Sequence, residues 1–180
     1  MSNDEAPSRA KPKRGPRKTG GGSAKARRKA ARLAAVQALY QVDQTGIGVE
    51  PVIGEFVKHR FGEDVDGAQF VAADPQLFAD IVRGASHRKA EVDGLLSGAL
   101  DPKFPLERLE MLLRAILRAG AYEVFAHADT HPRILISEYV DVAHAFFAGR
   151  EPGMVNGVLD SVARKVRAEE LSQPAPGRDE

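Results

Sequence analysis

The sequence predicts an all-α protein, a compact bundle of six or seven helices joined by short connections. Apolar residues recur at helical spacing through most of the chain, and no segment shows the alternation of a strand. Ala, Leu and Val dominate the 43% hydrophobic content, whereas aromatic residues make up 6% and Trp is absent. This composition favours the packing of helices over a sheet sandwich.

The first helix is expected over residues 24–44, with Ser23 as its N-cap. Leu33, Val36 and Tyr40 lie on one apolar stripe of this helix. Residues 2–32, which include the start of this helix, contain no Val, Ile, Leu, Met, Phe, Trp or Tyr. Because nothing there can be buried to offset the entropy of ordering, the region before the helix is expected to be disordered.

Further helices follow from apolar spacing and from the residues that interrupt it. A short helix is expected around residues 51–60 and a loop over 62–73, after which Asp74-Pro75 opens a helix to about residue 100. The most apolar segment, 105–126, predicts a central core helix. Thr130 and Pro132 open the next helix, residues 149–153 form a turn, and the last helix covers 154–170. The predicted organisation is a basic tail (1–23), one helical domain (24–170) and a flexible C-terminal tail (171–180).

Charge is distributed very unevenly. Residues 1–32 carry 11 Lys and Arg against two acidic residues, a net charge of +9, whereas residues 33–180 carry 15 basic and 23 acidic residues, a net charge of −8. This asymmetry indicates a polyanion-seeking arm on an acidic body. The helix-borne cations Arg27, Arg28, Lys29 and Arg32 favour nucleic-acid binding, while a solvated tail and a phosphate-binding tail remain equally open for the residues before Lys25.

Several classes of function are excluded or disfavoured. The chain has no Cys, which rules out a disulfide framework and a thiolate nucleophile. It has no apolar run of about 18 residues and no apolar secretory signal, so we expect a cytoplasmic protein without a membrane span. The sequence also lacks P-loop, GxGxxG, GxSxG and HExxH motifs, so we expect no catalytic residue, metal or cofactor. Carboxylates such as Glu107 and Glu123 are expected on solvated helix faces.

Five segments in the same order resemble the NusB family of transcription antitermination factors. They are Ala26–Tyr40, the segment Phe78–Gly84 with Asp93-Gly94-Leu95, Arg114–Glu123, Ile136–Ala143 and Val155–Asp160. The resemblance covers roughly residues 24–168. It implies two packed helical subdomains and a non-enzymatic role in antitermination of ribosomal RNA operons. It further implies binding of boxA-type single-stranded RNA together with NusE, a small-subunit ribosomal protein, within an RNA polymerase complex.

The resemblance also implies roles for individual residues. Lys25, Arg27, Arg28, Lys29 and Arg32 belong to the basic start that meets RNA, and Arg118 matches a basic position near that surface. Tyr40 and Glu107 match positions that face NusE, although a core aromatic and a helix-start carboxylate are equally good interpretations of them. The chain departs from the family pattern at Gly153-Met154, where many relatives have Lys-Phe, and at Leu113, where an acidic residue is common. Met154 is expected to cover a base more weakly than Phe.

Two alternatives remain beside the antitermination factor. One is a sequence-indifferent RNA-binding or ribosome-assembly protein that uses the same basic arm. The other is the RNA-binding part of an RNA methyltransferase system, which we expect to need a cofactor domain and a Cys that this chain lacks. Whether the free protein forms a homodimer stays open.

Overall fold

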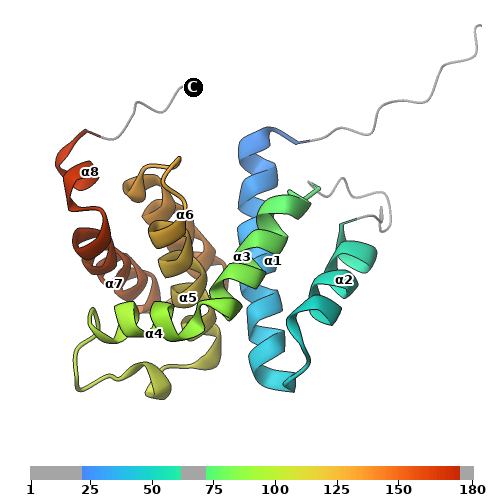
Figure 1. Cartoon of the computed structure of the whole chain (residues 1–180), viewed down its shortest axis with the longest axis horizontal. Coiled ribbons are helices and arrows are strands. Elements are labelled where there is room, and N and C mark those ends of the chain that lie inside the picture. Colours follow the sequence, from blue (N-terminus) through green and yellow to red (C-terminus); the bar gives the residue numbers. More distant parts are fainter. Residues whose placement is uncertain (1–21, 62–71, 175–180) are drawn as a thin grey trace, which may run out of the picture.

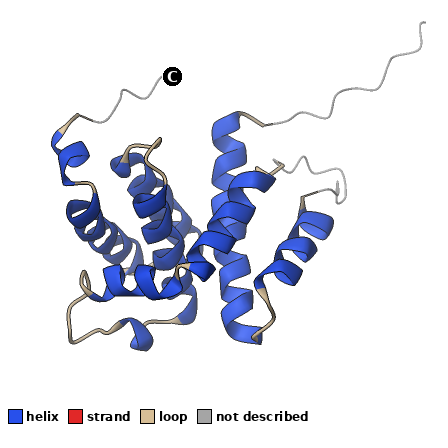
Figure 2. Ribbon diagram, viewed as in Figure 1, coloured by secondary structure: helices blue, strands red, loops and turns tan. Residues whose placement is uncertain are grey.

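The computed structural model describes residues 22–61 and 72–174, and within these ranges it contains eight α-helices, one 3-10 turn and no strand. The all-α prediction is confirmed (Figures 1 and 2). Most of the expected N-terminal tail and of the expected loop at 62–73 lies outside the described residues. The elements are α1 (Ala24–Thr45), α2 (Val49–Arg60), α3 (Pro75–His87), α4 (Lys89–Ser97), η1 (Leu106–Arg108), α5 (Met111–Ala126), α6 (Pro132–Phe146), α7 (Glu151–Val166) and α8 (Ala168–Ser172).

The helices form two groups that share α5. Figure 1 shows α1, α2 and α3 together on one side, with α6, α7 and α8 on the other. Helix α5 packs against α1, α3, α4, α6 and α7, so it joins the two groups. Every residue of α5 from Ala115 to Val124 is buried. This agrees with the central core helix that the apolar segment predicted.

Side chains and a glycine fix the ends of the helices. Ser23 Oγ accepts a hydrogen bond from the Ala26 N–H at 3.2 Å and caps α1 as predicted. At the other end of α1, Gly46 adopts a left-handed conformation with a φ of 70°, and its N–H donates to the Val42 carbonyl at 3.0 Å. Helix α6 is capped by the His131 side chain, not by Thr130.

One long helix expected over 74–100 is two helices. The chain leaves the helical conformation at Arg88, where φ is −100° and ψ is 24°. The Arg88 guanidinium lies 4.1 Å from the centroid of the Phe125 ring and also pairs with Glu91. The turn directs α4 against α5, where Asp93 contacts Arg118. The contacts of Arg88 with Phe125 and of Asp93 with Arg118 join distant segments, so the local apolar spacing could not predict them.

Three further boundaries differ from the expected ones. Helix α5 begins at Met111, because residues 109 and 110 are extended and a 3-10 turn precedes them. Helix α7 begins at Glu151, and Pro152 fits in its first turn. The helix expected over 154–170 is interrupted at Arg167, whose guanidinium donates to the carbonyls of His127 and Thr130 at 2.9 Å. Helix α8 then extends into the expected C-terminal tail as far as Ser172, and Leu171 is buried.

Candidate nucleic-acid interface

The first two turns of α1 present a basic surface. Lys25, Arg27 and Arg28 are all exposed. Among the described residues, none of these three has a carboxylate within salt-bridge distance. The first turn of α1 contains no acidic residue, so the positive end of the helix dipole adds to the side-chain charge. This surface is therefore suited to bind anions such as phosphate.

Lys29 lies on the same helix but already has a partner. Its Nζ donates to Asp141 Oδ2 of α6 at 2.9 Å, and both side chains are about half exposed. The hydrogen bond to Asp141 raises the pKa of Lys29, so its ammonium stays charged. A phosphate that binds Lys29 must compete with this exposed pair, which is worth about 0.2–1 kcal/mol.

Arg32, one turn further along α1, points into the bundle and is only 5% exposed. Its Nε and Nη2 donate to the two oxygens of Glu123 at 2.8 and 3.0 Å. The third nitrogen, Nη1, lies 3.5 Å from Glu138. Burial opposes the charged form of Arg32, but the hydrogen bonds to Glu123 outweigh it, and the pKa of Arg32 is raised. In this conformation the guanidinium of Arg32 is committed to protein carboxylates.

Glu123 is a fully buried carboxylate, in contrast to the solvated position expected for it. It also accepts a hydrogen bond from the Tyr139 hydroxyl at 2.6 Å. Burial alone would raise the pKa of Glu123, but hydrogen bonds from His127 and Arg32 outweigh it and lower that pKa to about 2. Glu123 is therefore ionised over the whole neutral range. Burying an ion costs several kcal/mol, so this carboxylate depends on its donors.

Arg118 in α5 is a second buried arginine that binds carboxylates of other helices, and it is 8% exposed. Its Nε and Nη2 donate to Asp93 of α4 at 2.7 and 2.9 Å, and its Nη1 donates to Asp43 of α1 at 2.6 Å. Burial opposes the charged form of Arg118, but the bonds to the two aspartates outweigh it and its pKa is raised. Like Arg32, Arg118 joins helices in this structure.

The residues expected to face a partner protein lie in a different region. Tyr40 is half-buried and borders a surface groove between α1, α2, α5 and α6. The same groove contains Gln37, Gln41 and Gln44 of α1 together with Leu112 and Phe146. Glu107 is exposed on η1. Leu113 of α5, which stands where an acidic residue is common in the family, is buried. Tyr40 thus lies beside an amide-rich, partly apolar groove.

Comparison with known proteins decides the family. A family model described as "NusB family" matches residues 29–164. The chain belongs to the NusB family. It is 48% identical over 161 residues to the transcription antitermination protein NusB of Bradyrhizobium sp. strain BTAi1, covering 89% of this chain and 95% of the relative. It is 49% identical over 147 residues to the protein of the same name from Rhodopseudomonas palustris strain BisB18, covering 82% and 87%.

Solved NusB structures have the same fold. T. maritima NusB superposes with a TM-score of 0.65 at 25% identity, over 81% of this chain and 97% of the other. A NusB solved with NusE and double-stranded RNA gives a TM-score of 0.64 at 23% identity, over 77% and 96%. The match to the NusB family model begins at Lys29, so Lys25, Arg27 and Arg28 lie just before it.

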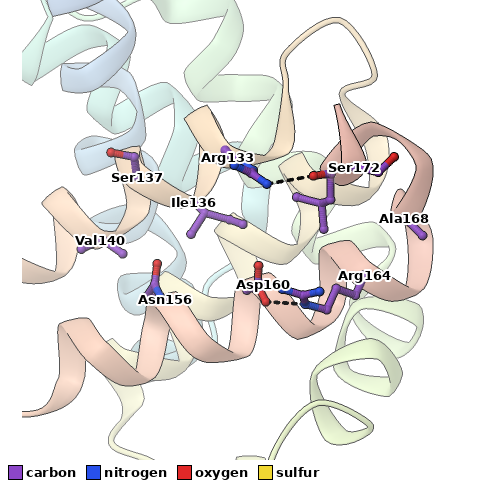
Figure 3. Close-up of a pocket in the computed structure, with 10 residues that line it drawn as sticks. Arg133, Ile136, Ser137, Val140, Asn156, Asp160, Arg164, Ala168 and Ser172 are labelled. Atoms are coloured by element: carbon purple, nitrogen blue, oxygen red, sulfur yellow. Dashed lines mark hydrogen bonds and ion pairs between the residues drawn. The ribbon is translucent and has the colours of Figure 1, made fainter. Parts of the chain in front are cut away.

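A second groove on this NusB fold contains none of the predicted site residues. It lies between α6, α7 and α8, with Ile136, Val140 and Leu171 as its apolar part (Figure 3). Arg133 donates to the Leu171 carbonyl at 2.9 Å on one wall, and Arg164 pairs with Asp160 on the other. Met154, near the start of α7, is half-buried and lies outside this groove.

The carboxylates that hold the arginines were missed by reasoning from sequence. Glu123 lies in the most apolar segment of the NusB domain, between Tyr122 and Val124. A single charge in such a segment is a usable signal, because an ion is buried only with a partner. No comparable signal marks Asp43 and Asp93, which are far apart in the sequence from each other and from Arg118.

The described residues contain no cluster of three or more side chains suited to hold a metal ion. Within the same ranges, no helix is both long enough and apolar enough to cross a membrane.

Proposed function

We propose that this chain is a non-enzymatic, cytoplasmic transcription antitermination factor that binds boxA-type RNA of ribosomal RNA operons. In this proposal it acts together with NusE and joins the antitermination complex on RNA polymerase. Membership of the NusB family and the names of its close relatives support the role. The single observation that carries the RNA-binding part is the cluster of exposed cations on the first two turns of α1.

The proposal divides the predicted RNA-binding residues by their place in the structure. Lys25, Arg27 and Arg28 bind phosphates directly, and Lys29 joins them when RNA displaces Asp141. Arg32 and Arg118 act from within, by holding α1 against the rest of the bundle. Met154 covers a base at the start of α7. Phosphate contacts supply affinity, and the partner protein adds specificity.

Salt dependence tests the direct contacts. Fluorescence anisotropy would follow a boxA-type RNA and a scrambled RNA between 50 and 200 mM salt, with and without NusE. In the double variant Lys25→Ala/Arg28→Ala, we expect weaker binding and a log–log salt slope reduced by about 1.4, since each single-strand phosphate contact contributes about 0.7. The matched control removes two exposed lysines elsewhere, Lys58→Ala/Lys103→Ala, and should leave the slope unchanged.

The same titrations separate the alternatives. Tighter binding of the boxA-type RNA than of the scrambled RNA in the presence of NusE supports the antitermination role. Equal binding of both RNAs, with and without NusE, would instead indicate a protein that coats RNA without regard to sequence. No binding of either RNA at 50 mM salt with NusE present would refute the RNA-binding proposal altogether.

The partner face is tested separately by calorimetric titration of NusE. Tyr40→Ala and Glu107→Ala should each weaken NusE binding at least fivefold, because one removes a groove-side aromatic and the other an exposed charge. Glu91→Ala removes an exposed carboxylate from α4 and serves as the control. If both variants bind NusE as the wild type does, the partner lies on another surface.

A further inference from the structure

A chain of polar side chains runs from the surface of α3 to the buried side of α1. Asp80 of α3 is half exposed, and its Oδ2 lies 2.6 Å from Nε2 of His127, the residue that follows α5. Nδ1 of the same imidazole lies 3.3 Å from Glu123 Oε1. Glu123 in turn holds the Arg32 guanidinium. A group at the solvent edge is thereby linked to the helix that carries the basic surface.

Most side chains on the buried face of α1 are small, with Val36 and Leu39 as its larger buried apolar residues. Ala31, Ala34, Ala35 and Ala38 form much of that face and are 0–8% exposed. Alanine side chains make shallower ridges than Val or Leu side chains, so they constrain the rotation of a helix less. A guanidinium that binds both oxygens of one carboxylate has a fixed planar geometry. The Arg32–Glu123 pair therefore adds a directional constraint on the orientation of α1 to the one that its apolar contacts supply.

We propose that Glu123 and His127 are positioning residues for RNA binding: through Arg32 they set the orientation in which α1 presents Lys25, Arg27 and Arg28. Neither residue offers a free charge to RNA, since Glu123 is fully buried and the His127 side chain, which is 20% exposed, contacts Asp80 and Glu123. This inference rests on the proposed RNA-binding function.

The protonation state of His127 makes this chain of polar contacts dependent on pH. A charged imidazolium donates to both Asp80 and Glu123, whereas a neutral imidazole donates to only one of them. The hydrogen bond to Glu123 raises the pKa of His127 above 6.5, burial works against this, and Asp80 adds to the rise. The charged His127 imidazolium therefore contributes fully to the stability of the folded protein below pH 6.5. This contribution is lost as the pH rises through the higher pKa that His127 has in the folded state.

Other groups around His127 favour the same arrangement. The Tyr122 ring packs edge-on at 5.7 Å, and its hydroxyl donates to Asp80 at 3.3 Å. Arg167, between α7 and α8, donates to the His127 carbonyl at 2.9 Å and so holds the backbone in place. Arg32 of α1 donates to both oxygens of Glu123, including Oε1, which also faces Nδ1 of His127.

The test compares the wild type with Glu123→Gln and His127→Gln at several pH values. Anisotropy with a boxA-type RNA and NusE would be measured from pH 6.0 to 8.5. We expect wild-type RNA affinity to fall at least threefold over this range. His127→Gln should stay at the weaker level throughout, and Glu123→Gln should bind RNA about tenfold more weakly at pH 6.0. The matched control is Glu91→Gln, which removes the same charge from an exposed pair with Arg88 and should follow the wild type.

Amide hydrogen exchange provides a readout without RNA. In both positioning variants, the amides of residues 27–34 should exchange faster than in the wild type at the same pH. The exchange rates of residues 39–45 should change less than twofold, and so should the affinity for NusE. His127→Gln retains the Arg32–Glu123 pair, so it carries the test if Glu123→Gln does not fold.

Three outcomes would overturn the inference. In the first, both variants bind RNA as tightly as the wild type does. In the second, RNA affinity depends on pH in the same way in the wild type and in His127→Gln. In the third, amide exchange in the variants is faster by the same factor in all helices. A wild type that binds no RNA while both variants still loosen residues 27–34 would refute the proposed function and keep the positioning of α1 by Glu123 and His127.

Discussion

Gly84 shows how one residue decides the approach of two helices. It lies in α3 where Tyr122 of α5 packs directly over the backbone, and an added Cβ would lie 1.9 Å from the Tyr122 Cζ. The ring has little freedom to move away, because its hydroxyl contacts Asp80 and its edge contacts His127. The close packing of α3 on α5 therefore requires a residue without a side chain.

We expect Gly84→Ala to lower the free energy of unfolding by about 1–3 kcal/mol, the usual cost of overpacking a core. Urea denaturation followed by circular dichroism would measure it. In the exposed Gly54 of α2, no atom would lie within 4 Å of an added Cβ. Gly54→Ala should accordingly stabilise the protein by about 0.4–1 kcal/mol. Equal effects of the two substitutions would show that helix propensity, and not contact with Tyr122, governs position 84.

At the scale of elements, the basic start of α1 opposes its own helix dipole. The exposed cations Lys25, Arg27 and Arg28 lie where negative charge would stabilise the helix, each at a cost of about 0.3–1 kcal/mol. The Ser23 side chain offsets part of this by accepting from the Ala26 N–H, and the Asp74 N–H donates to the Arg27 carbonyl at 3.1 Å. The cap is thus one of few local interactions that keep the proposed RNA surface helical.

Ser23→Ala should reduce the free energy of unfolding by about 1 kcal/mol, because an orphan N–H at the helix start loses its acceptor. Exchange of the amides at 24–27 should rise, and the same amides in Ser23→Asp should be as protected as in the wild type. Unchanged exchange in Ser23→Ala would mean that tertiary contacts, and not the cap, hold the first turn.

Across the whole molecule, Arg118 joins three helices that are distant in the sequence, α1, α4 and α5. It lies on the shared α5 and binds Asp43 of α1 and Asp93 of α4. Lys89 of α4 also reaches Asp43 at 3.3 Å, which extends the network. Helices α1, α4 and α5 are therefore held together by charge as well as by apolar burial.

Arg118→Met should destabilise the protein by roughly 2 kcal/mol in urea denaturation. Breaking a buried pair usually costs about 3–5 kcal/mol, and the partial exposure of both aspartates lessens this. Adding Asp43→Asn and Asp93→Asn to the variant should restore part of the loss, since uncompensated charges are removed. Arg164→Met, which breaks an exposed i,i+4 pair with Asp160, should change stability by less than about 0.5 kcal/mol. If Arg118→Met lowers the free energy of unfolding no more than Arg164→Met does, Arg118 does not hold these helices together.

The sequence alone determined the all-helical class, the central apolar helix, the caps at Ser23 and Asp74, and the concentration of positive charge at one end. These are local properties, because apolar spacing, capping and charge are set by neighbours along the chain. Only the tertiary structure decided which basic residues face solvent. Arg28 and Arg32 are four residues apart on one helix, yet Arg28 is exposed and Arg32 is buried. The difference arises from Glu123, 91 residues further along the chain, which α5 brings beneath Arg32 and which no periodicity in α1 can reveal.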